Sequence, residues 1–329
     1  VESVDLQAGT VRTDAGEQLS YDKLVFATGA RVARPAIAAT RVSGVEEMRT
    51  LADARRLREL SLTGGRAVVV GGGLLGLEAA YGLNTLGFET TVLHRRDYLM
   101  NRQLDAEGGH LLRRKMACSG IRFRLQNSVS AINTLNSKLT SITLQDGAVL
   151  PCDLLVFATG IDPNADLARS AGIATQRGVL VNRFMRTSSQ GCFALGECSQ
   201  LGQHCFGLVA PIRAQAEVLA RTLLGKPGPG FVVGDWPTQL KISGIEIFSA
   251  GDPDAQGEQL LLRDESAGIY RRLVLRDGRL VGAVLVGDKC EGSWYRELIQ
   301  SAADISRYRP GLMFGREVSE AMQLSAVAA

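Results

Sequence analysis

Residues 66–80 read RAVVVGGGLLGLEAA, an apolar run of strand length that passes through three closely spaced glycines into a run of helix formers. Gly71, Gly73 and Gly76 have the spacing G-x-G-x-x-G, between the strand and the helix that a dinucleotide-binding turn requires. Gly71 would make the tight turn, Gly73 would let the backbone approach a pyrophosphate, and Gly76 would allow close helix packing. The phosphates would lie at the helix N-terminus, beside the N–H groups of Leu74, Leu75 and Gly76. A plain structural turn is the alternative.

A second feature is an internal repeat, in which YDKLVFATG at residues 21–29 recurs as CDLLVFATG at residues 152–160. Nine of the sixteen residues that end at each ATG are identical, which indicates that one structural unit was used twice. Only the second copy has a glycine fingerprint upstream of it. The offset from Gly71 to Gly160 is 160 − 71 = 89 residues, so the first fingerprint is expected roughly 60 residues before Val1. We therefore expect a fragment that lacks about half of its first nucleotide-binding domain.

Strand and helix patterns alternate around the fingerprint, which predicts a mostly parallel sheet with right-handed crossovers. The expected strands are residues 66–70, 89–94, 121–125 and 154–159, and the expected helices are residues 74–86 and 105–119. Further helices are expected at residues 50–62 and 208–224. Beyond the breaker GKPGPG at residues 225–230, antiparallel strands are expected at 240–249, 270–275 and 280–287, and a helix at 294–301.

The predicted fold class is α/β, with two doubly wound, Rossmann-like dinucleotide-binding domains, the first incomplete, and a small C-terminal α+β domain. The expected bounds are residues 1–60 for the partial first domain, 61–176 for the second, 177–226 for a return segment of the first, 231–315 for the C-terminal domain, and 316–329 for an unpatterned tail.

Composition excludes several classes of function. The 37 basic and 34 acidic residues are spread along the chain and leave a net charge of +3, so no basic stripe indicates a nucleic-acid partner. No apolar run is long enough to span a membrane. The six cysteines have no metal-binding spacing, so no metal is predicted, and we expect buried, reduced thiols. The cytoplasm is favoured as the compartment in which nicotinamide cofactors are used.

Charged residues near the fingerprint bear on the choice of nucleotide. The strand that follows should end in an acidic residue if the ribose 2′-hydroxyl is free, but it ends in His94, Arg95 and Arg96. Two guanidiniums there could pair with the 2′-phosphate of NADPH, or could simply be solvated. Glu78, expected in the first turn of the helix, would either approach the nicotinamide side of the site or only improve the helix start.

The repeat, the fingerprint and the segment CFALGECSQ at residues 192–200 together resemble the two-dinucleotide flavoprotein disulfide-reductase superfamily. Within it, the chain is most similar to the flavin region of the assimilatory NAD(P)H nitrite reductase large subunit and of related nitrate-assimilation electron-transfer subunits. That likeness rests on HRRDYLMNRQLD at 94–105, FGLVAPIRAQA at 206–216, QLKISGIEIFSAGD at 239–252 and RLVLRDGRLVGAVLVGD at 272–288.

The resemblance implies FAD and either NADH or NADPH as cofactors. It assigns to the FAD site Thr28, Gly29, Gly196, Glu197 (where the family has Asp) and, at the start of a helix aimed at the flavin, Val209, Ala210 and Pro211. It places Thr159 and Gly160 at the nicotinamide nucleotide. Hydride transfer between stacked rings needs no side-chain acid or base, so no catalytic residue is named.

The function that the resemblance implies is an electron-input module for nitrite or nitrate reduction. Hydride would pass from NAD(P)H to flavin, and single electrons would pass on to a partner that carries an iron-sulfur or sirohaem centre. A rubredoxin or ferredoxin reductase, serving a small separate redox protein, is one alternative. A truncated, non-catalytic NAD(P)H-binding protein is another, and a homodimer is left open.

Overall fold

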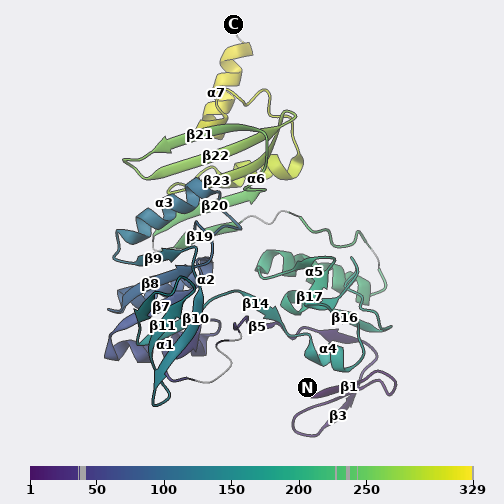
Figure 1. The fold of residues 1–329 in the computed structure, drawn as a ribbon. Helices are drawn as coiled ribbons and strands as arrows, with labels where there is room; N and C mark the ends of the chain where they lie inside the picture. The colour runs from purple at the N-terminus through teal and green to yellow at the C-terminus, as the bar shows by residue number, and fades with distance from the viewer. Residues whose placement is uncertain (36, 38–41, 227, 235–237, 243, 328–329) are drawn as a thin grey trace. The chain divides into compact units, whose positions relative to one another are not determined.

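The computed structural model describes residues 1–35, 37, 42–226, 228–234, 238–242 and 244–327. The chain divides into two compact units, each built from two separate stretches of sequence (Figure 1). The first unit comprises Val1–Ala33 and Gly160–Gly234, and the second comprises Arg34–Thr159 and Asp235–Ala329.

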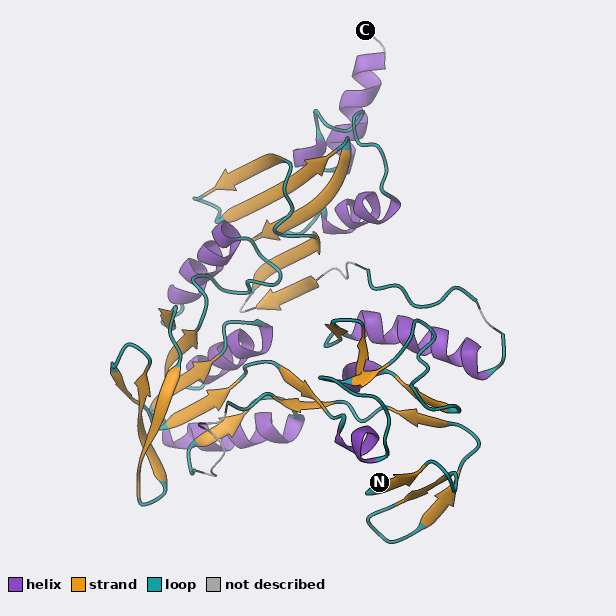
Figure 2. Cartoon of the chain, turned by 45° about the vertical axis from the view of Figure 1, so that its right-hand side comes forward, coloured by secondary structure: helices purple, strands orange, loops and turns teal. Residues whose placement is uncertain are grey.

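A five-stranded parallel sheet in the order β6-β13-β7-β8-β9 forms the centre of the second unit (Figure 2). Its strands are β6 (Val45–Glu47), β13 (Leu154–Phe157), β7 (Arg66–Val70), β8 (Glu89–His94) and β9 (Arg122–Leu125). Their short runs of Val, Leu and Thr suit a sheet that is covered on both faces. The predicted strands at β7, β8, β9 and β13 are confirmed within one or two residues.

Helices α1 (Leu51–Leu60), α2 (Leu74–Thr85) and α3 (Ala106–Ala117) connect these strands. Thr50 and Asp53 form a reciprocal capping box that begins α1, and the Asp105 carboxylate caps α3 by accepting from Gly108 N–H at 3.3 Å. The apolar sides of α2 and α3 share one core with the sheet, whose members include Ala67, Val69, Leu77, Ala80, Leu83, Leu112 and Met116. The second unit therefore has the predicted doubly wound fold.

An antiparallel meander leaves this sheet after β9. Its strands are β10 (Val129–Leu135), β11 (Lys138–Leu144) and β12 (Val149–Pro151), and the chain then returns through Asp153 to β13. The Asp153 carboxylate accepts from Arg66 N–H at 2.9 Å and pairs with the Arg66 guanidinium at 3.1 Å. This contact joins the end of the meander to the start of β7.

The C-terminal part of the second unit is an antiparallel sheet in the order β19-β20-β23-β22-β21. Its elements are β19 (Thr238–Ile242), β20 (Ile245–Gly251), β21 (Glu258–Asp264), β22 (Ile269–Arg276), β23 (Arg279–Val286), α6 (Gly292–Ser301), the 3-10 turn η4 (Leu312–Phe314) and α7 (Arg316–Val327). Ile247, Tyr270 and Val284 belong to the same apolar core as α2 and α3. The C-terminal domain is therefore packed onto the parallel-sheet domain.

A polar contact reinforces this packing. The hydroxyl of Tyr270, a side chain only 2% exposed, donates to the Asp105 carboxylate at 2.6 Å. Burial, followed by the hydrogen bond to Asp105, raises the pKa of Tyr270 far above its ordinary value, so the phenol keeps its proton. Because Asp105 also caps α3, one carboxylate holds both the helix and the C-terminal sheet.

The first unit is a set of small sheets. They are the meander of β1 (Ser3–Asp5), β2 (Thr10–Arg12) and β3 (Gln18–Ser20), the parallel pair β4 (Leu24–Phe26) and β16 (Cys192–Ala194), the antiparallel pair β5 (Ala30–Val32) and β14 (Ile161–Pro163), and the sheet of β15 (Val179–Leu180), β17 (Ser199–Leu201) and β18 (His204–Cys205). Helices α4 (Asp166–Ser170) and α5 (Val209–Leu223) complete it. The predicted helix at residues 208–224 is α5.

The observed boundaries between units differ from the expected ones. Residues 34–60 belong to the second unit, because β6 pairs with β13 and Leu57 of α1 is buried in its core. Residues 161–176 belong to the first unit, because β14 pairs with β5. The crossing at Ala33 therefore comes four residues after the first ATG, and the crossing at Thr159–Gly160 lies within the second.

Three local predictions are wrong. The strand expected at 240–249 is the hairpin β19–β20, and Gly244 in its turn has a φ of +82°, which favours glycine. Strand β21 was missed because EQLLLRD does not alternate between apolar and polar residues. The expected tail holds helix α7, whose side chains Val318 and Met322 are four residues apart and form no long apolar stripe.

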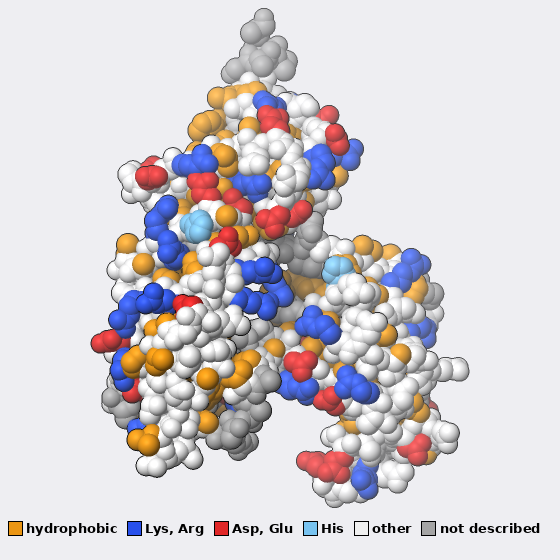
Figure 3. Space-filling view, viewed as in Figure 1, with side chains coloured by type: hydrophobic (Ala, Val, Ile, Leu, Met, Phe, Trp, Pro, Cys, Tyr) orange, Lys and Arg blue, Asp and Glu red, His pale blue; other side chains and the backbone are white. Residues whose placement is uncertain are grey.

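Surface charge, helix length and cysteine burial can be compared with the composition. On the face shown in Figure 3, Lys and Arg side chains lie in separate groups with Asp and Glu side chains among them. Within the described residues, no helix has the length and apolar character to cross a bilayer. Three cysteines are buried as expected, Cys205 is half-buried, and Cys118 and Cys290 are exposed.

Tyr270→Phe tests the contact between α3 and the C-terminal sheet. The change leaves a mostly buried Asp105 oxygen without its donor, so we expect the free energy of unfolding to fall by about 1–2 kcal/mol. Urea denaturation followed by circular dichroism measures it. Tyr81→Phe, on the solvent side of α2, is the control and should change stability by less than about 0.5 kcal/mol. Equal stability of the two variants would show that the hydrogen bond contributes nothing.

Candidate functional site

The glycine turn lies between the carboxyl end of β7 and the first residue of α2. Because β13, β7 and β8 are parallel neighbours, their carboxyl ends lie at the same edge of the sheet. Thr159, Gly71 and His94 lie at these ends or just beyond them. Gly73 is the N-cap residue of α2 and has no capping side chain. No side chain therefore accepts a capping hydrogen bond from the first-turn N–H groups, which belong to Leu74, Leu75 and Gly76. A phosphate site requires such N–H groups.

Each fingerprint glycine can be tested by the space that a Cβ would need. A Cβ on Gly71 would lie 2.3 Å from the Ala158 carbonyl oxygen, and one on Gly76 would lie 2.0 Å from the carbonyl oxygen of Gly71. Both glycines are therefore required by the fold itself. A Cβ on Gly73 would meet nothing within 4 Å, and its φ of −90° suits any residue. No contact or backbone angle within the protein requires glycine at position 73. The close approach of a ligand to this backbone would require it, so Gly73 fits a nucleotide site.

His94 supports the turn from the end of β8. Gly72 N–H donates to His94 Nδ1 at 3.1 Å, and Met100 N–H donates to the Gly72 carbonyl at 2.8 Å. Burial, together with the charges of Arg95 and Arg96, lowers the pKa of His94 and keeps the accepting nitrogen unprotonated. The His94 side chain thus accepts its hydrogen bond from the glycine turn, while the side chains of Arg95 and Arg96 are exposed.

Glu78 does not lie where the sequence placed it. Helix α2 begins at Leu74, so Glu78 is its fifth residue and lies in the second turn, outside the reach of the unpaired N–H groups. Partial burial raises the pKa of Glu78, the opposite of what a helix N-terminus would do. The expected role in starting the helix is therefore wrong.

In the first unit, the exit strands of the two repeats pair with each other. Strand β5 follows Gly29 and strand β14 follows Gly160, and they form an antiparallel ladder. The ladder is extended by Asn164 N–H to Gly29 oxygen at 2.9 Å and by Ala33 N–H to Gly160 oxygen at 3.0 Å. Thr28 Oγ1 donates to the Asn164 carbonyl at 2.6 Å. Gly160 thus accepts from Ala33 within the first unit, and Thr159 is the last residue of the first stretch of the second unit.

Gly196, another residue predicted for FAD, lies at the same sheet edge as Thr28. Strands β4 and β16 are parallel, so Thr28 and Gly196 follow strands that end at one edge. Gly196 has a φ of +82°, and its N–H donates to Gln215 Oε1 of helix α5 at 2.8 Å. Gln215 is fully buried, and its Nε2 has no partner among the described residues.

The start of α5 is open to solvent. Val209 is 70% exposed, Ala210 is exposed, and Pro211 is buried, while the N-cap residue Leu208 provides no side-chain cap. Free N–H groups at an exposed helix start can stabilise negative charge on a bound group. Together with Gln215 Nε2, they are polar groups still available to a ligand, so the FAD residues present in the chain fit that role. Glu197 is half-buried in the short turn η3 (Gly196–Cys198) that precedes them.

Three residues that support these sites were not predicted as site residues. Ala158 leaves no room for a side chain at Gly71. Asn164 donates to the Thr28 carbonyl, and Gln215 accepts from Gly196 N–H. Each acts on a residue far away in the chain, so only the packed structure identifies it. Ala158 lies in the repeated LVFATG segment and Gln215 in FGLVAPIRAQA, but neither segment assigned them a role.

Comparison with known proteins agrees with this geometry. The family model described as pyridine nucleotide-disulphide oxidoreductase matches residues 1–216. The chain belongs to this family. The model of the rubredoxin NAD+ reductase C-terminal domain matches residues 237–303. Proteins of this family use FAD and NAD(P)H.

Two curated relatives and one solved structure show what this chain is similar to. Nitrite reductase [NAD(P)H] of Bacillus subtilis is 41% identical over 92% of this chain, which spans 38% of that relative. The ferredoxin--NAD(+) reductase component of the biphenyl dioxygenase system of Paraburkholderia xenovorans is 31% identical over 93% of the chain and 76% of the relative. The covalent putidaredoxin reductase–putidaredoxin complex has the same fold, with a TM-score of 0.84, 23% identity, and coverage of 99% of this chain and 80% of that one.

Gly73→Ala separates a ligand-binding glycine from a structural one. A Cβ here meets no protein atom, so we expect the free energy of unfolding to change by only about 0.5 kcal/mol. The affinity for NADH and NADPH should fall at least about tenfold, because the methyl group occupies the space that the pyrophosphate needs. Isothermal titration calorimetry measures the affinity. Gly82→Ala, in the same helix and equally free of contacts, should leave it unchanged. Equal affinities of the two variants would rule out the pyrophosphate at Gly73.

The His94 contact predicts a pH dependence of stability. Since its pKa in the folded chain lies below the unfolded value of about 6.5, its contribution is complete above that pH and is lost as the pH falls through the lowered pKa. The melting temperature of the chain should therefore fall relative to that of His94→Asn, which does not titrate, between about pH 6.5 and pH 5. Differential scanning calorimetry across this range tests it. A constant difference between the two proteins would contradict it.

Proposed function

We propose that this chain is the electron-input module of an NAD(P)H-dependent nitrite or nitrate reductase. The observation that carries the proposal is that 92% of the chain matches the B. subtilis nitrite reductase. It is supported by a glycine turn that is open to a ligand at Gly73 and by a second group of residues that would fit FAD. The two LVFATG segments end in separate sheets, as two cofactor sites require. The partner would be an iron-sulfur or sirohaem centre, which accepts single electrons.

The residues of the chain have binding and orienting roles in this proposal. The turn from Gly71 to Gly76 would hold the pyrophosphate of the nicotinamide nucleotide, and the first turn of α5 would stabilise negative charge on FAD. When bound, FAD accepts a hydride from NAD(P)H and releases electrons one at a time. Thr28, Gly29, Gly196 and Glu197 would contact FAD. No side chain is assigned a proton transfer, because hydride transfer needs none.

A ferredoxin or rubredoxin reductase is the second candidate. It is favoured by the 76% coverage of the P. xenovorans reductase component and by the match of residues 237–303 to the rubredoxin NAD+ reductase C-terminal domain. In both candidates the first half of the reaction is the same, and only the acceptor differs. The cytoplasm suits both, and light scattering would determine whether the protein is a homodimer.

Two measurements test the proposed function. The purified chain should be yellow or take up FAD, with an absorbance near about 450 nm that is bleached by NADH or NADPH. The complete gene product should then consume nitrite with the same nucleotide. Flavin reduction with electron transfer to a ferredoxin or rubredoxin, but not to nitrite, would support the second candidate. A colourless chain that binds NAD(P)H and no FAD would leave a non-catalytic nucleotide-binding protein.

We further propose that Arg95 and Arg96 bind the 2′-phosphate of NADPH. Both follow β8, where an acidic residue would otherwise hold a free ribose hydroxyl, and no carboxylate in the described part of the chain forms an ion pair with either. His94, at the end of the strand, accepts from Gly72 and presents no negative charge. Guanidinium groups bind phosphate with two parallel hydrogen bonds, which favours NADPH over NADH.

Arg95→Gln/Arg96→Gln tests this assignment. The double variant should bind NADPH at least about tenfold more weakly, because two charge-assisted contacts are lost, and should bind NADH as before. Calorimetric titration with each nucleotide measures the ratio. Arg102→Gln, which is also exposed and lies in the segment after β8, is the control. An equal loss for both nucleotides would mean that the arginines do not recognise the 2′-phosphate.

A further inference from the structure

The middle glycine of the turn, Gly72, is not part of the G-x-G-x-x-G spacing, yet the structure requires it. A Cβ on Gly72 would lie 2.7 Å from Cγ and 2.8 Å from Cδ2 of the His94 ring, and 2.9 Å from Cδ2 of Leu99. The imidazole therefore packs directly against the Gly72 backbone and leaves no room for a side chain. Gly72 and His94 are matched to each other although they are 22 positions apart in the chain.

Hydrogen bonds hold the peptide groups on both sides of Gly72. Its N–H donates to His94 Nδ1 at 3.1 Å, and its carbonyl accepts from Met100 N–H at 2.8 Å. Met100 is only 1% exposed and has a φ of +52°, a conformation that is costly for a residue with a bulky side chain. Such strain persists only where the surrounding structure imposes it, and here it accompanies the hydrogen bond to Gly72.

These contacts orient the backbone that a nucleotide would approach. A trans peptide is planar, so its C=O and N–H point in opposite directions. The Met100 contact with the Gly72 carbonyl therefore fixes the direction of the Gly73 N–H, which belongs to the same peptide. In the same way, the His94 contact fixes the peptide that joins Gly71 to Gly72. Both peptides that lead into Gly73 are thus held before a ligand arrives.

We propose that His94 is a positioning residue for the nicotinamide nucleotide, and that protonation of its Nδ1 releases Gly72 and weakens nucleotide binding. A neutral imidazole can accept at Nδ1, but an imidazolium has donors on both nitrogens, so the Gly72 N–H would then face another N–H. Gly72 would keep its contact with Met100 and lose the one with His94. This inference rests on the nucleotide site of the proposed function.

The surroundings of His94 set the direction of the expected pH dependence. Burial and the positive charges of Arg95 and Arg96 lower its pKa, while contacts with Asn101 and with the Tyr98 backbone act in the opposite direction. Because the lowered pKa lies below the ordinary value of about 6.5, the ring is neutral at neutral pH. Nucleotide affinity should therefore be greatest there and fall as the pH decreases through the lowered pKa, in proportion to the fraction of neutral His94.

Calorimetric titration of the chain with ADP-ribose between about pH 7.5 and pH 5 tests the proposal. ADP-ribose contains the pyrophosphate, lacks the acid-labile dihydronicotinamide ring, and has no 2′-phosphate that could titrate or contact Arg95 and Arg96. The affinity of the unchanged chain should fall at least about threefold over this range, because the binding-competent fraction decreases. Circular dichroism at each pH follows the folded state.

Two variants separate the acceptor from the ring. His94→Asn has an acceptor, Oδ1, at the same number of bonds from Cα as Nδ1, and it does not titrate, so its affinity should match that of the unchanged chain at neutral pH and stay constant. His94→Leu has the same branching without an acceptor, and should bind about three- to tenfold more weakly at every pH because one hydrogen bond is lost. His110→Asn, which removes the other histidine of the second unit, should keep the pH dependence.

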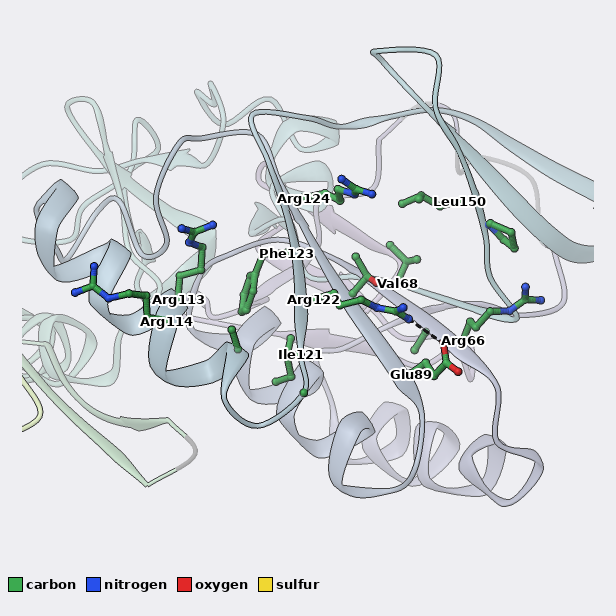
Figure 4. Close-up of a pocket in the computed structure, with 15 residues that line it drawn as sticks. Arg66, Val68, Glu89, Arg113, Arg114, Ile121, Arg122, Phe123, Arg124 and Leu150 are labelled. Atoms are coloured by element: carbon green, nitrogen blue, oxygen red, sulfur yellow. Dashed lines mark hydrogen bonds and ion pairs between the residues drawn. The ribbon is translucent and has the colours of Figure 1, made fainter. Parts of the chain in front are cut away.

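A second control removes a contact at the opposite end of the same sheet. Figure 4 shows Arg122, the first residue of β9, paired with Glu89, the first residue of β8, and the distance between them is 2.9 Å. Both side chains are exposed, and both strands run from this end toward the edge at which the glycine turn lies. Arg122→Gln should therefore leave the affinity and its pH dependence unchanged.

Equal affinities of His94→Asn and His94→Leu would overturn the proposal, because the acceptor would then position nothing. An affinity of the unchanged chain that is constant or rises in acid would also overturn it, since the imidazolium would then be tolerated or would attract the pyrophosphate. If Gly73→Ala still weakens binding in these cases, the nucleotide site stands and only the role of His94 is excluded. A chain that binds no ADP-ribose would exclude both.

Discussion

The close approach of helix α2 to the glycine turn is the constraint on which the nucleotide-binding domain depends. A side chain at Gly76 would lie 2.0 Å from the carbonyl oxygen of Gly71, so the helix can begin directly at the strand end only without one. This contact directs the N–H groups that open α2 along the sheet edge where β13, β7 and β8 end. It also leaves Gly73 open on the outside, and the chemistry of the site follows from that arrangement.

The supports of this turn come from distant parts of the chain. Ala158, after β13, lies against Gly71, and His94, the last residue of β8, accepts from Gly72. The first unit has similar long-range supports. Gln215 of α5 accepts from Gly196 N–H, and Asn164 donates to the Thr28 carbonyl. In each unit, a glycine backbone that would meet a cofactor is fixed by a polar or small side chain from a neighbouring element. Such fixing keeps the binding groups oriented before a ligand arrives.

The repeat has a structural counterpart in the ladder of β5 and β14. Each strand begins directly after an ATG, so the chain leaves both repeats through one pair of hydrogen-bonded strands. Arg31 pairs with Asp162 and Asp166 across this ladder at 2.7 Å. Because these ion pairs are exposed, their contribution to stability is small, and the backbone ladder is the main connection. The segments that follow the two repeats are therefore paired with each other within the first unit.

Much of the fold and of the site was determined by the sequence alone. Local patterns predicted β7, α2, β8, α3, β13 and α5, because alternation, caps and glycine spacing act within a few residues. The fingerprint also identified Gly71, Gly73 and Gly76. Tertiary structure decided the rest: the split at Ala33 and Gly160, the hydrogen bond that His94 accepts from Gly72, and the second-turn position of Glu78. These depend on which distant strands become neighbours, and pairing between strands far apart in the chain leaves no periodic signal in either segment.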